Sequence, residues 1–292
     1  MRTPGERFQS LPDFPYQPHY IEINGLRMHY VSEGAGDPIL CLHGEPTWAY
    51  LYRKMIPTLA QVGCVIAPDL IGFGRSDKLP HREDYSVALH AKQVTDFITQ
   101  LDLRNVTLVC QDWGGLLGLP MVAEMPGRFA RVDVMNTFIP TGDEQPSDGF
   151  LRWRGFAAKQ TDMDIGFVVQ SGCVSKLAPE VIAAYNAPFP EASYKAGAHQ
   201  FPLLVPITPD DPASEWMRKA RTFFSTWTKP ALVMFSDSDP VTRGGEKFFR
   251  RLIPSAQNEP EIMIAQAGHF LQEDKGEEIA EQIKQFIERR PI

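Results

Sequence analysis

The stretch Val109–Leu116 holds the residues whose types and spacing point most directly to chemistry. An apolar, strand-like run reaches Asp112 and then passes through Gly114 and Gly115 into an apolar, helix-like segment. Small residues beside a central nucleophile let a strand and a helix approach closely while the nucleophile is presented at the sheet edge. Cys110 stands where glycine is commoner, but its side chain is still small. The pattern predicts a nucleophile at Asp112; the alternative is that Asp112 only caps the helix.

A nucleophilic aspartate suits different chemistry from a serine. Its carboxylate is ionised at neutral pH, so it can attack without a base. It is suited to displacement at a saturated carbon, which leaves a covalent ester on the carboxylate. A base is needed only afterwards, when water must hydrolyse that ester.

His269 is the candidate for this base, because it directly follows the last predicted strand and lies late in the chain. The order nucleophile, acid, histidine is the one found in hydrolases with this kind of turn. The alternative is a strand-end histidine bonded to the backbone. Surface or structural roles are expected for His19, His29, His81, His90 and His199, which stand in polar or helical contexts.

The acid that orients the histidine should follow a strand between these two positions. After the predicted strand Ala231–Phe235 the chain carries two candidates, Asp237 and Asp239. We assign Asp239 the role of fixing the tautomer and stabilising the imidazolium. Asp237 is then expected to form the turn.

A second loop, His43–Trp48, follows a predicted strand and precedes a predicted helix. Backbone N–H groups in such a loop and directly after the nucleophile form the oxyanion hole for ester hydrolysis. We assign these donors to Glu45 and Trp113. Ordinary helix-start chemistry at Pro46 and Thr47 fits the same loop, and both interpretations can hold together.

Strand-like and helix-like segments alternate along much of the chain. An Asn-Gly turn predicts an opening hairpin, and unbroken apolar runs predict strands covered on both faces, as in a parallel sheet. The predicted strands are Tyr20–Ile23, Leu26–Val31, Pro38–Leu42, Val65–Pro68, Val106–Cys110, Arg131–Met135, Ala231–Phe235 and Glu261–Ala265. The predicted helices are Trp48–Val62, Val87–Leu101, Leu116–Glu124 and Glu277–Arg289. This alternation predicts an α/β fold with a doubly wound, mostly parallel sheet.

The alternation stops between about residues 137 and 215. This segment is rich in proline and aromatic residues and predicts short helices, such as Pro179–Tyr185. We therefore expect a core formed by residues 1–137 and 216–292, interrupted after the sixth strand by a helical cap of residues 138–215. A cap over the carboxyl ends of the strands would cover the place where open α/β sheets bind ligands.

The composition excludes several classes of protein. With 43% hydrophobic and 22% charged residues, the 292-residue chain is not extensively disordered. Its net charge of −7 argues against nucleic-acid or anionic-membrane partners. Its apolar runs are too short to span a membrane, and its first residues contain no apolar signal segment. The four cysteines, Cys41, Cys64, Cys110 and Cys173, form no CxxC pair, which predicts reduced thiols in a cytoplasmic protein and no metal site.

Taken together, these motifs resemble those of the haloalkane dehalogenases of the α/β-hydrolase fold, over essentially the whole chain. The segments that carry the resemblance are His43–Thr47, Gly72–Asp77, Gln111–Gly115 and Ala267–Phe270. The resemblance implies hydrolysis of haloalkanes to an alcohol and a halide ion through an alkyl ester of Asp112. It implies a small halogenated substrate and water as partners, no cofactor, and a monomer.

The resemblance also implies two tryptophans that bind the departing halide. One directly follows the nucleophile and is Trp113. Where one subfamily has an asparagine in the His-Gly-x-Pro loop, this chain has Glu45, which favours the subfamily that takes its second tryptophan from the start of the cap. Trp153 is the candidate, and packing within the cap is the alternative. Pocket-lining roles are expected for the aromatic residues Phe150, Phe167 and Phe201.

Two other functions compete with this one. An epoxide hydrolase would use the same aspartate and histidine, with cap tyrosines protonating the leaving alkoxide; Tyr185 and Tyr194 are available for that role. A protein of this fold that only binds a ligand is the third possibility, because fold does not determine function. Such proteins typically lack one member of the triad.

Overall fold

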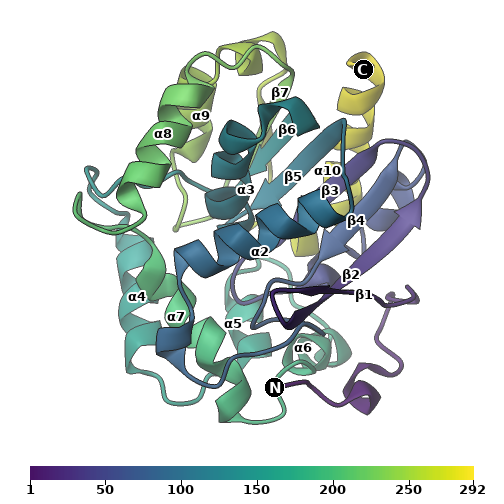
Figure 1. The fold of residues 1–292 in the computed structure, drawn as a ribbon, viewed down its shortest axis with the longest axis vertical. Helices are drawn as coiled ribbons and strands as arrows, with labels where there is room; N and C mark the ends of the chain where they lie inside the picture. The colour runs from purple at the N-terminus through teal and green to yellow at the C-terminus, as the bar shows by residue number, and fades with distance from the viewer.

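Eight strands form one sheet in the computed structural model, which describes residues 1–292. They are β1 (His19–Ile23), β2 (Leu26–Gly34), β3 (Pro38–Leu42), β4 (Cys64–Pro68), β5 (Val106–Gln111), β6 (Phe129–Met135), β7 (Ala231–Ser236) and β8 (Ile262–Ile264). Their order is β1-β2-β4-β3-β5-β6-β7-β8. The β1–β2 and β2–β4 pairs are antiparallel and the other pairs parallel. The predicted doubly wound, mostly parallel sheet is confirmed (Figure 1).

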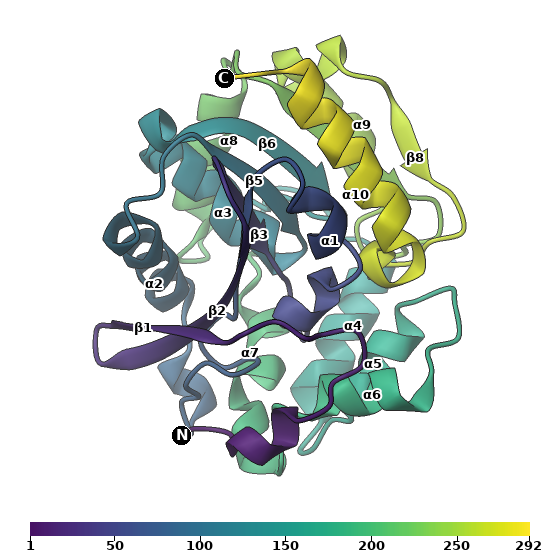
Figure 2. The same cartoon turned by 90° about the vertical axis from the view of Figure 1, so that its right-hand side faces the viewer.

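Ten α-helices accompany the sheet. They are α1 (Ile56–Leu59), α2 (Val87–Gln100), α3 (Trp113–Glu124), α4 (Asp148–Lys159), α5 (Ile165–Ser171), α6 (Pro179–Asn186), α7 (Ala196–Leu204), α8 (Ser214–Phe224), α9 (Gly245–Leu252) and α10 (Leu271–Arg289). Figure 2 shows α2 and α3 on one face of the sheet and α1 and α10 on the other. None of the helices combines the length and apolar character needed to cross a membrane.

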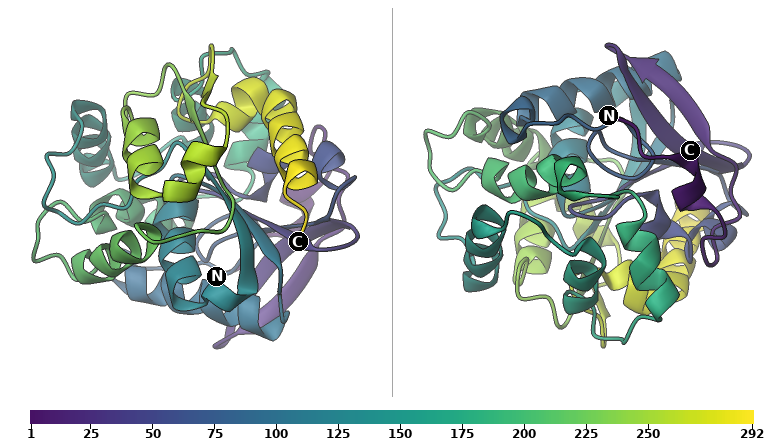
Figure 3. Two further views of the ribbon diagram at one scale, coloured as in Figure 1. Left: turned by 90° about the horizontal axis from the view of Figure 1, so that it is seen from above. Right: turned by 90° about the horizontal axis from the view of Figure 1, so that it is seen from below.

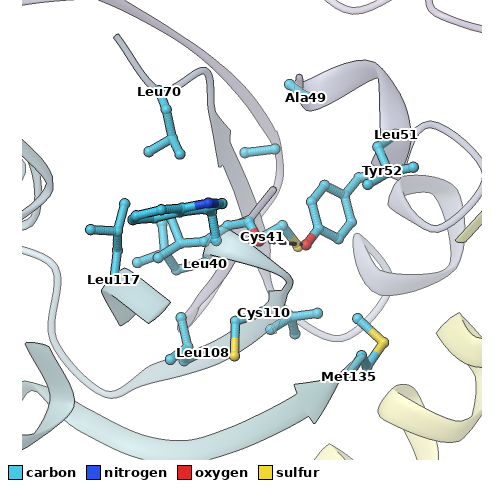
Figure 4. Close-up of a cluster of buried hydrophobic side chains, with 14 of the residues drawn as sticks. Leu40, Cys41, Ala49, Leu51, Tyr52, Leu70, Leu108, Cys110, Leu117 and Met135 are labelled. Atoms are coloured by element: carbon cyan, nitrogen blue, oxygen red, sulfur yellow. Dashed lines mark hydrogen bonds between the residues drawn. The ribbon is translucent and has the colours of Figure 1, made fainter. Parts of the chain in front are cut away.

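One predicted helix is wrong. Instead of a single helix over 48–62, the chain forms a 3-10 turn at Ala49–Tyr52 and the four-residue α1. The apolar spacing of this segment reflects burial rather than a regular helix, since all four residues of the 3-10 turn are fully buried. Tyr52 shows why the segment folds so tightly. Its hydroxyl donates to the carbonyl oxygen of Leu42 at 2.8 Å, within a cluster of buried side chains from β3 and β5 (Figure 4).

The helices α4 to α7 lie between β6 and β7 in the chain and gather at one end of the sheet (Figures 1 and 3). A view from below shows them spread over that end, with the N-terminus beside them. We call them the cap helices. One cluster of buried side chains runs without a break from the sheet into these helices, and it includes Val168 and Phe201. The cap helices are therefore held to the sheet by shared hydrophobic burial.

The close approach of α3 to the sheet yields a first prediction. A Cβ on Gly114 would lie 1.9 Å from the carbonyl oxygen of Leu42, which belongs to β3 and cannot move aside. Gly114→Ala should therefore cost at least ~3 kcal/mol of stability and lower the thermal unfolding midpoint by about 6 °C or more. Gly155→Ala is the matched control, because Gly155 also lies in a helix and has open space where a Cβ would stand. Equal midpoints for the two variants would contradict the packing described here.

Candidate active site

Asp112 occupies the turn between β5 and α3. Its φ of 50° and ψ of −123° lie outside the ordinary β and α regions, a conformation that persists only where the surrounding packing imposes it. Gly114 lets α3 approach the sheet, and Gly44 leaves room for the carboxyl group, since a Cβ there would lie 2.3 Å from Asp112 Oδ1. The side chain is thereby presented at the carboxyl end of β5.

His269 lies between two carboxylates. Its Nδ1 is 3.0 Å from Oδ2 of Asp239, and its Nε2 is 3.4 Å from Oδ2 of Asp112. Asp239 is buried and is itself fixed by the backbone N–H groups of Val241 and Thr242, at 2.8 and 3.2 Å. The structure thus brings together the three residues that the sequence analysis selected as nucleophile, acid and base.

The second candidate for the acid, Asp237, points elsewhere. Its exposed carboxylate accepts hydrogen bonds from the N–H groups of Gln266 and Ala267, at 3.0 and 3.4 Å. It ties the end of β7 to the loop that leads to His269. This is the turn-forming role expected for it.

The charge on His269 depends on its two neighbours. Burial opposes the imidazolium, but the carboxylates of Asp239 and Asp112 outweigh that effect and raise the pKa of His269 to about 10. The histidine is therefore protonated at neutral pH. Neutralising Asp112 would remove one of the two attractions and lower this pKa.

A cavity of about 260 Å³ opens at this point. Its lining includes the predicted nucleophile and base, Asp112 and His269, and both predicted halide ligands, Trp113 and Trp153. Glu45 lines it as well. Asp239 stands behind His269 and is not part of the lining. Trp113 begins α3, whereas Trp153 comes from the cap helix α4. The cavity is therefore bounded by the sheet on one side and by the cap helices on the other.

The three predicted pocket aromatics have different positions. Phe150, on α4, lines the cavity. Phe167 does not, and this expectation is wrong: its side chain is 63% exposed on the outer face of α5. Phe201 is fully buried behind Trp113, with ring centroids 4.7 Å apart, so it supports the tryptophan and is not among the lining residues. A repeat of apolar residues along a short helix does not say which face turns inward.

The cap tyrosines do not reach the cavity. Tyr185 is buried and its hydroxyl donates to Glu273, on the side of α6 that faces the core. Tyr194 lies at the edge of the hydrophobic cluster. Neither residue is among the lining residues, so the arrangement that an epoxide hydrolase would need is not present.

Two amide side chains hold the histidine loop, and the sequence analysis missed both. Asn136, directly after β6, donates to the carbonyl oxygens of Gly268 and His269 at 3.0 and 3.1 Å. Gln111, the last residue of β5, donates to the same His269 carbonyl at 3.2 Å and lies 3.2 Å from Nε2 of the ring. Both follow the rule that strand ends position site residues. Neither is a carboxylate, the residue type expected as the partner of the histidine.

A third missed residue links the histidine loop to the cap helices. The carboxylate of Asp274 accepts hydrogen bonds from the N–H of Gly268 at 2.8 Å and from those of Val174 and Ser175, between α5 and α6, at 2.9 and 2.8 Å. Beside it, Glu273 forms a buried ion pair with Arg53. Two consecutive acidic residues thus tie α10, the histidine loop and the cap helices together.

Several buried histidines lie outside the site. His29, His90 and His199 are buried, so a surface position is wrong for them and a structural one remains. His29 is hydrogen-bonded to Asp69 at 2.8 Å. All four cysteines are free thiols, and Cys173 lines the cavity. No cluster of three or more histidine, cysteine or acidic side chains is arranged to hold a metal ion.

Glu45 contributes to the site through its backbone and its side chain in different ways. Its N–H donates to Oδ1 of Asp112 at 2.8 Å, which is the geometry expected of an oxyanion-hole donor. Its carboxyl group is buried in the cavity wall, and one oxygen has no hydrogen-bond partner. Burial, reinforced by the charge of Asp112, raises the pKa of Glu45 well above its usual value. Burial therefore favours the protonated, neutral form of this side chain.

Comparison with known proteins identifies the family. The α/β hydrolase fold family model matches residues 37–276. Haloalkane dehalogenases from Psychrobacter cryohalolentis and Mycolicibacterium paratuberculosis are 53% and 45% identical to the chain; the alignments cover 100% and 97% of this chain and 99% and 96% of the relatives. The chain belongs to the haloalkane dehalogenases. Its reaction is therefore the hydrolysis of a carbon–halogen bond to an alcohol and a halide ion.

Solved structures agree with this assignment. The tetrameric haloalkane dehalogenase DpaA from Paraglaciecola agarilytica NO2 superimposes with a TM-score of 0.91 at 40% identity, covering 97% of this dehalogenase and 96% of that chain. Haloalkane dehalogenase DatA from Agrobacterium tumefaciens C58 gives 0.80 at 27% identity, over 94% and 97%. The predicted α/β-hydrolase fold is thus confirmed along nearly the whole chain.

The raised pKa of Glu45 gives the second prediction. Unfolded glutamate ionises above about pH 4.5, whereas the pKa of Glu45 in the folded dehalogenase is raised, so this residue costs stability as pH rises. Glu45→Gln removes that cost. The difference in unfolding free energy, variant minus parent, should increase between pH 5 and pH 8 by up to ~1.4 kcal/mol per pH unit. Denaturant titrations at each pH measure it, and a difference that does not change with pH would mean that Glu45 is ionised.

Proposed function

We propose that this dehalogenase works through two half-reactions, with Asp112 as nucleophile and His269, oriented by Asp239, as base. The observation that carries the proposal is the shared cavity. The lining residues Asp112, His269, Trp113 and Trp153 supply a nucleophile, a base and two indole donors around one space of about 260 Å³. No other group is required for the reaction.

In the first half-reaction the Asp112 carboxylate attacks the halogen-bearing carbon. A carbon–oxygen bond forms, and the electron pair of the carbon–halogen bond leaves with the halide. Trp113 and Trp153 then hydrogen-bond to the ion, because an indole N–H is a donor with no acceptor site on an otherwise apolar ring. Burial raises the pKa of Glu45, which favours a neutral side chain that does not repel the ion. Trp153 in this role would place the enzyme in the subfamily with a cap tryptophan.

In the second half-reaction water hydrolyses the ester. Once Asp112 is esterified it no longer attracts a proton on His269, so the imidazole loses its proton more readily and becomes a base. It takes a proton from water, and the oxygen attacks the carbonyl carbon of the ester. The backbone N–H groups of Glu45 and Trp113 stabilise the resulting oxyanion. Its collapse breaks the bond between the carbonyl carbon and the alkyl oxygen. The leaving oxygen takes one of the two protons that water brought and the other stays on His269, so the alcohol departs and Asp112 is again a carboxylate.

A monomer in the cytoplasm is the proposed working unit. Every residue assigned to the reaction comes from one chain, which supports a monomer as sufficient for activity. The related DpaA is described as tetrameric, so light scattering at working concentrations is the measurement that distinguishes the two states.

The third prediction tests the reaction and the halide ligands. The purified chain should release halide from 1,2-dibromoethane and 1-bromobutane and should form no diol from styrene oxide. Asp112→Ala should abolish halide release. Trp153→Phe should lower its rate by about a hundredfold, by analogy with the loss of one transition-state donor, whereas the control Trp216→Phe should leave it unchanged, because Trp216 lies outside the cavity.

Other outcomes would contradict specific parts of this proposal. Diol without halide would assign the chain to epoxide hydrolysis. Binding of haloalkanes without either product would indicate a ligand-binding protein. Halide release that is insensitive to Trp153→Phe would leave Trp153 as a packing residue of the cap helices.

The fourth prediction separates the two half-reactions. His269→Gln removes the base but not the nucleophile, so it should release one halide per active site and then stop. Intact-protein mass spectrometry should show the added alkyl group. In the parent enzyme, single-turnover hydrolysis of the ester should speed up as pH rises, through a pKa lower than that of His269 in the free enzyme. Continuous turnover by His269→Gln would contradict the role assigned to His269.

A further inference from the structure

A second cavity, of about 360 Å³, adjoins the catalytic one at Asp112. Four residues line both cavities: Asp112, Phe150, Val205 and Val241. The second cavity is lined neither by Trp113 nor by Trp153, so it extends away from the proposed halide site. A substrate whose halogen sits against the two tryptophans therefore has room for a longer chain on the far side of the nucleophile.

The second cavity is lined by apolar residues in one part and by polar residues in another. Its apolar lining residues include Leu116 on α3 and Phe138, which follows β6. Its polar lining comes from two loops. The loop between β6 and α4 contributes Glu144 and Gln145, and the loop after β7 contributes Arg243. An alkyl chain with a polar far end matches such a lining better than a wholly apolar chain does.

The charges on the polar lining residues are not equivalent. Glu144 is already neutralised, because it forms an ion pair with Arg221. Arg243, in contrast, is exposed to solvent and takes part in none of the ion pairs or hydrogen bonds of the protein. A positive charge without a partner thus faces the outer part of a cavity that begins at the nucleophile.

We propose that Arg243 selects haloalkanes that carry a carboxylate at the end remote from the halogen. Methylene groups would lie along the apolar lining, and the carboxylate would pair with the guanidinium, whose planar donors match it in geometry. The hydrolysis product would then be an ω-hydroxy acid. This inference rests on the proposed function, since it takes Asp112 as the point where the carbon–halogen bond is broken.

The fifth prediction compares kcat/KM for 6-bromohexanoate and 1-bromohexane at low ionic strength. Arg243→Gln should lower the ratio of the two values about fivefold, as expected for an exposed charge pair, with little change for 1-bromohexane itself. Arg243→Glu should lower the ratio further. The effect should shrink in high salt, because ions screen exposed charges.

Arg152→Gln is the matched control. Arg152 is an exposed arginine on α4 that lines neither cavity, so the variant makes the same change in net charge at another place near the site. The ratio should stay at its parent value. Equal decreases in both arginine variants would show a general charge effect and overturn the assignment to Arg243.

Two further outcomes are distinguishable. If the parent enzyme turns over 1-bromohexane but the ratio is unaffected by either Arg243 variant, the inference is wrong and the dehalogenase mechanism stands. If neither bromide is turned over, the proposed function fails. A loss of activity toward both substrates in Arg243→Gln, with their ratio unchanged, would mean that Arg243 supports the structure of its loop and does not select substrate.

Discussion

Asp112 is held at a positive φ between β5 and α3, in a turn that closes only because neighbouring positions lack side chains. The packing energy of the fully buried β5 and of α3 maintains this backbone conformation. The same turn brings the Glu45 N–H to 2.8 Å from Oδ1 of Asp112. The other oxygen, Oδ2, lies 3.4 Å from Nε2 of His269. The backbone conformation of the turn therefore directs the two oxygens of one carboxyl group toward different partners.

Charge is distributed around this carboxylate in an ordered way. Two carboxylates outweigh the cost of burying His269 and raise its pKa, whereas burial raises the pKa of Glu45 and favours its neutral form. An ionised Glu45 at the cavity wall would repel a departing anion. Asp112 is the proposed nucleophile, so formation of the ester removes its charge. Esterification then changes the proton affinity of the histidine without any movement of the chain.

Much of the fold and the central part of the site could be predicted from the sequence. The apolar runs, the turn around Asp112 and the histidine after the last strand are local patterns, and β5, β7 and β8 brought their ends together as expected. Other features are set by tertiary contacts that no local pattern encodes. Phe167 is exposed because it lies on the face of α5 that turns outward. Phe201 is buried because it packs behind Trp113 and not against the cavity.

The supporting amides were hidden for a different reason. Asn136 and Gln111 act through bonds to backbone carbonyls of the histidine loop, 132 to 158 residues away in the chain. Amides at strand ends are common, so only their geometry distinguishes them. The segment after Trp48 shows the same limit, since complete burial there produced an apolar spacing that resembles a helix.

Trp153 belongs to α4, whereas the proposed nucleophile, base and acid all belong to the segments around the sheet. The groups proposed for the two chemical steps therefore lie partly in separate segments of the sequence. With the roles proposed above, replacement of residues in α4 changes how the leaving halide is bound and leaves the residues proposed for ester hydrolysis unchanged. Variation of α4 alone, in evolution or in a laboratory library, can on this basis change which halogenated substrates are accepted.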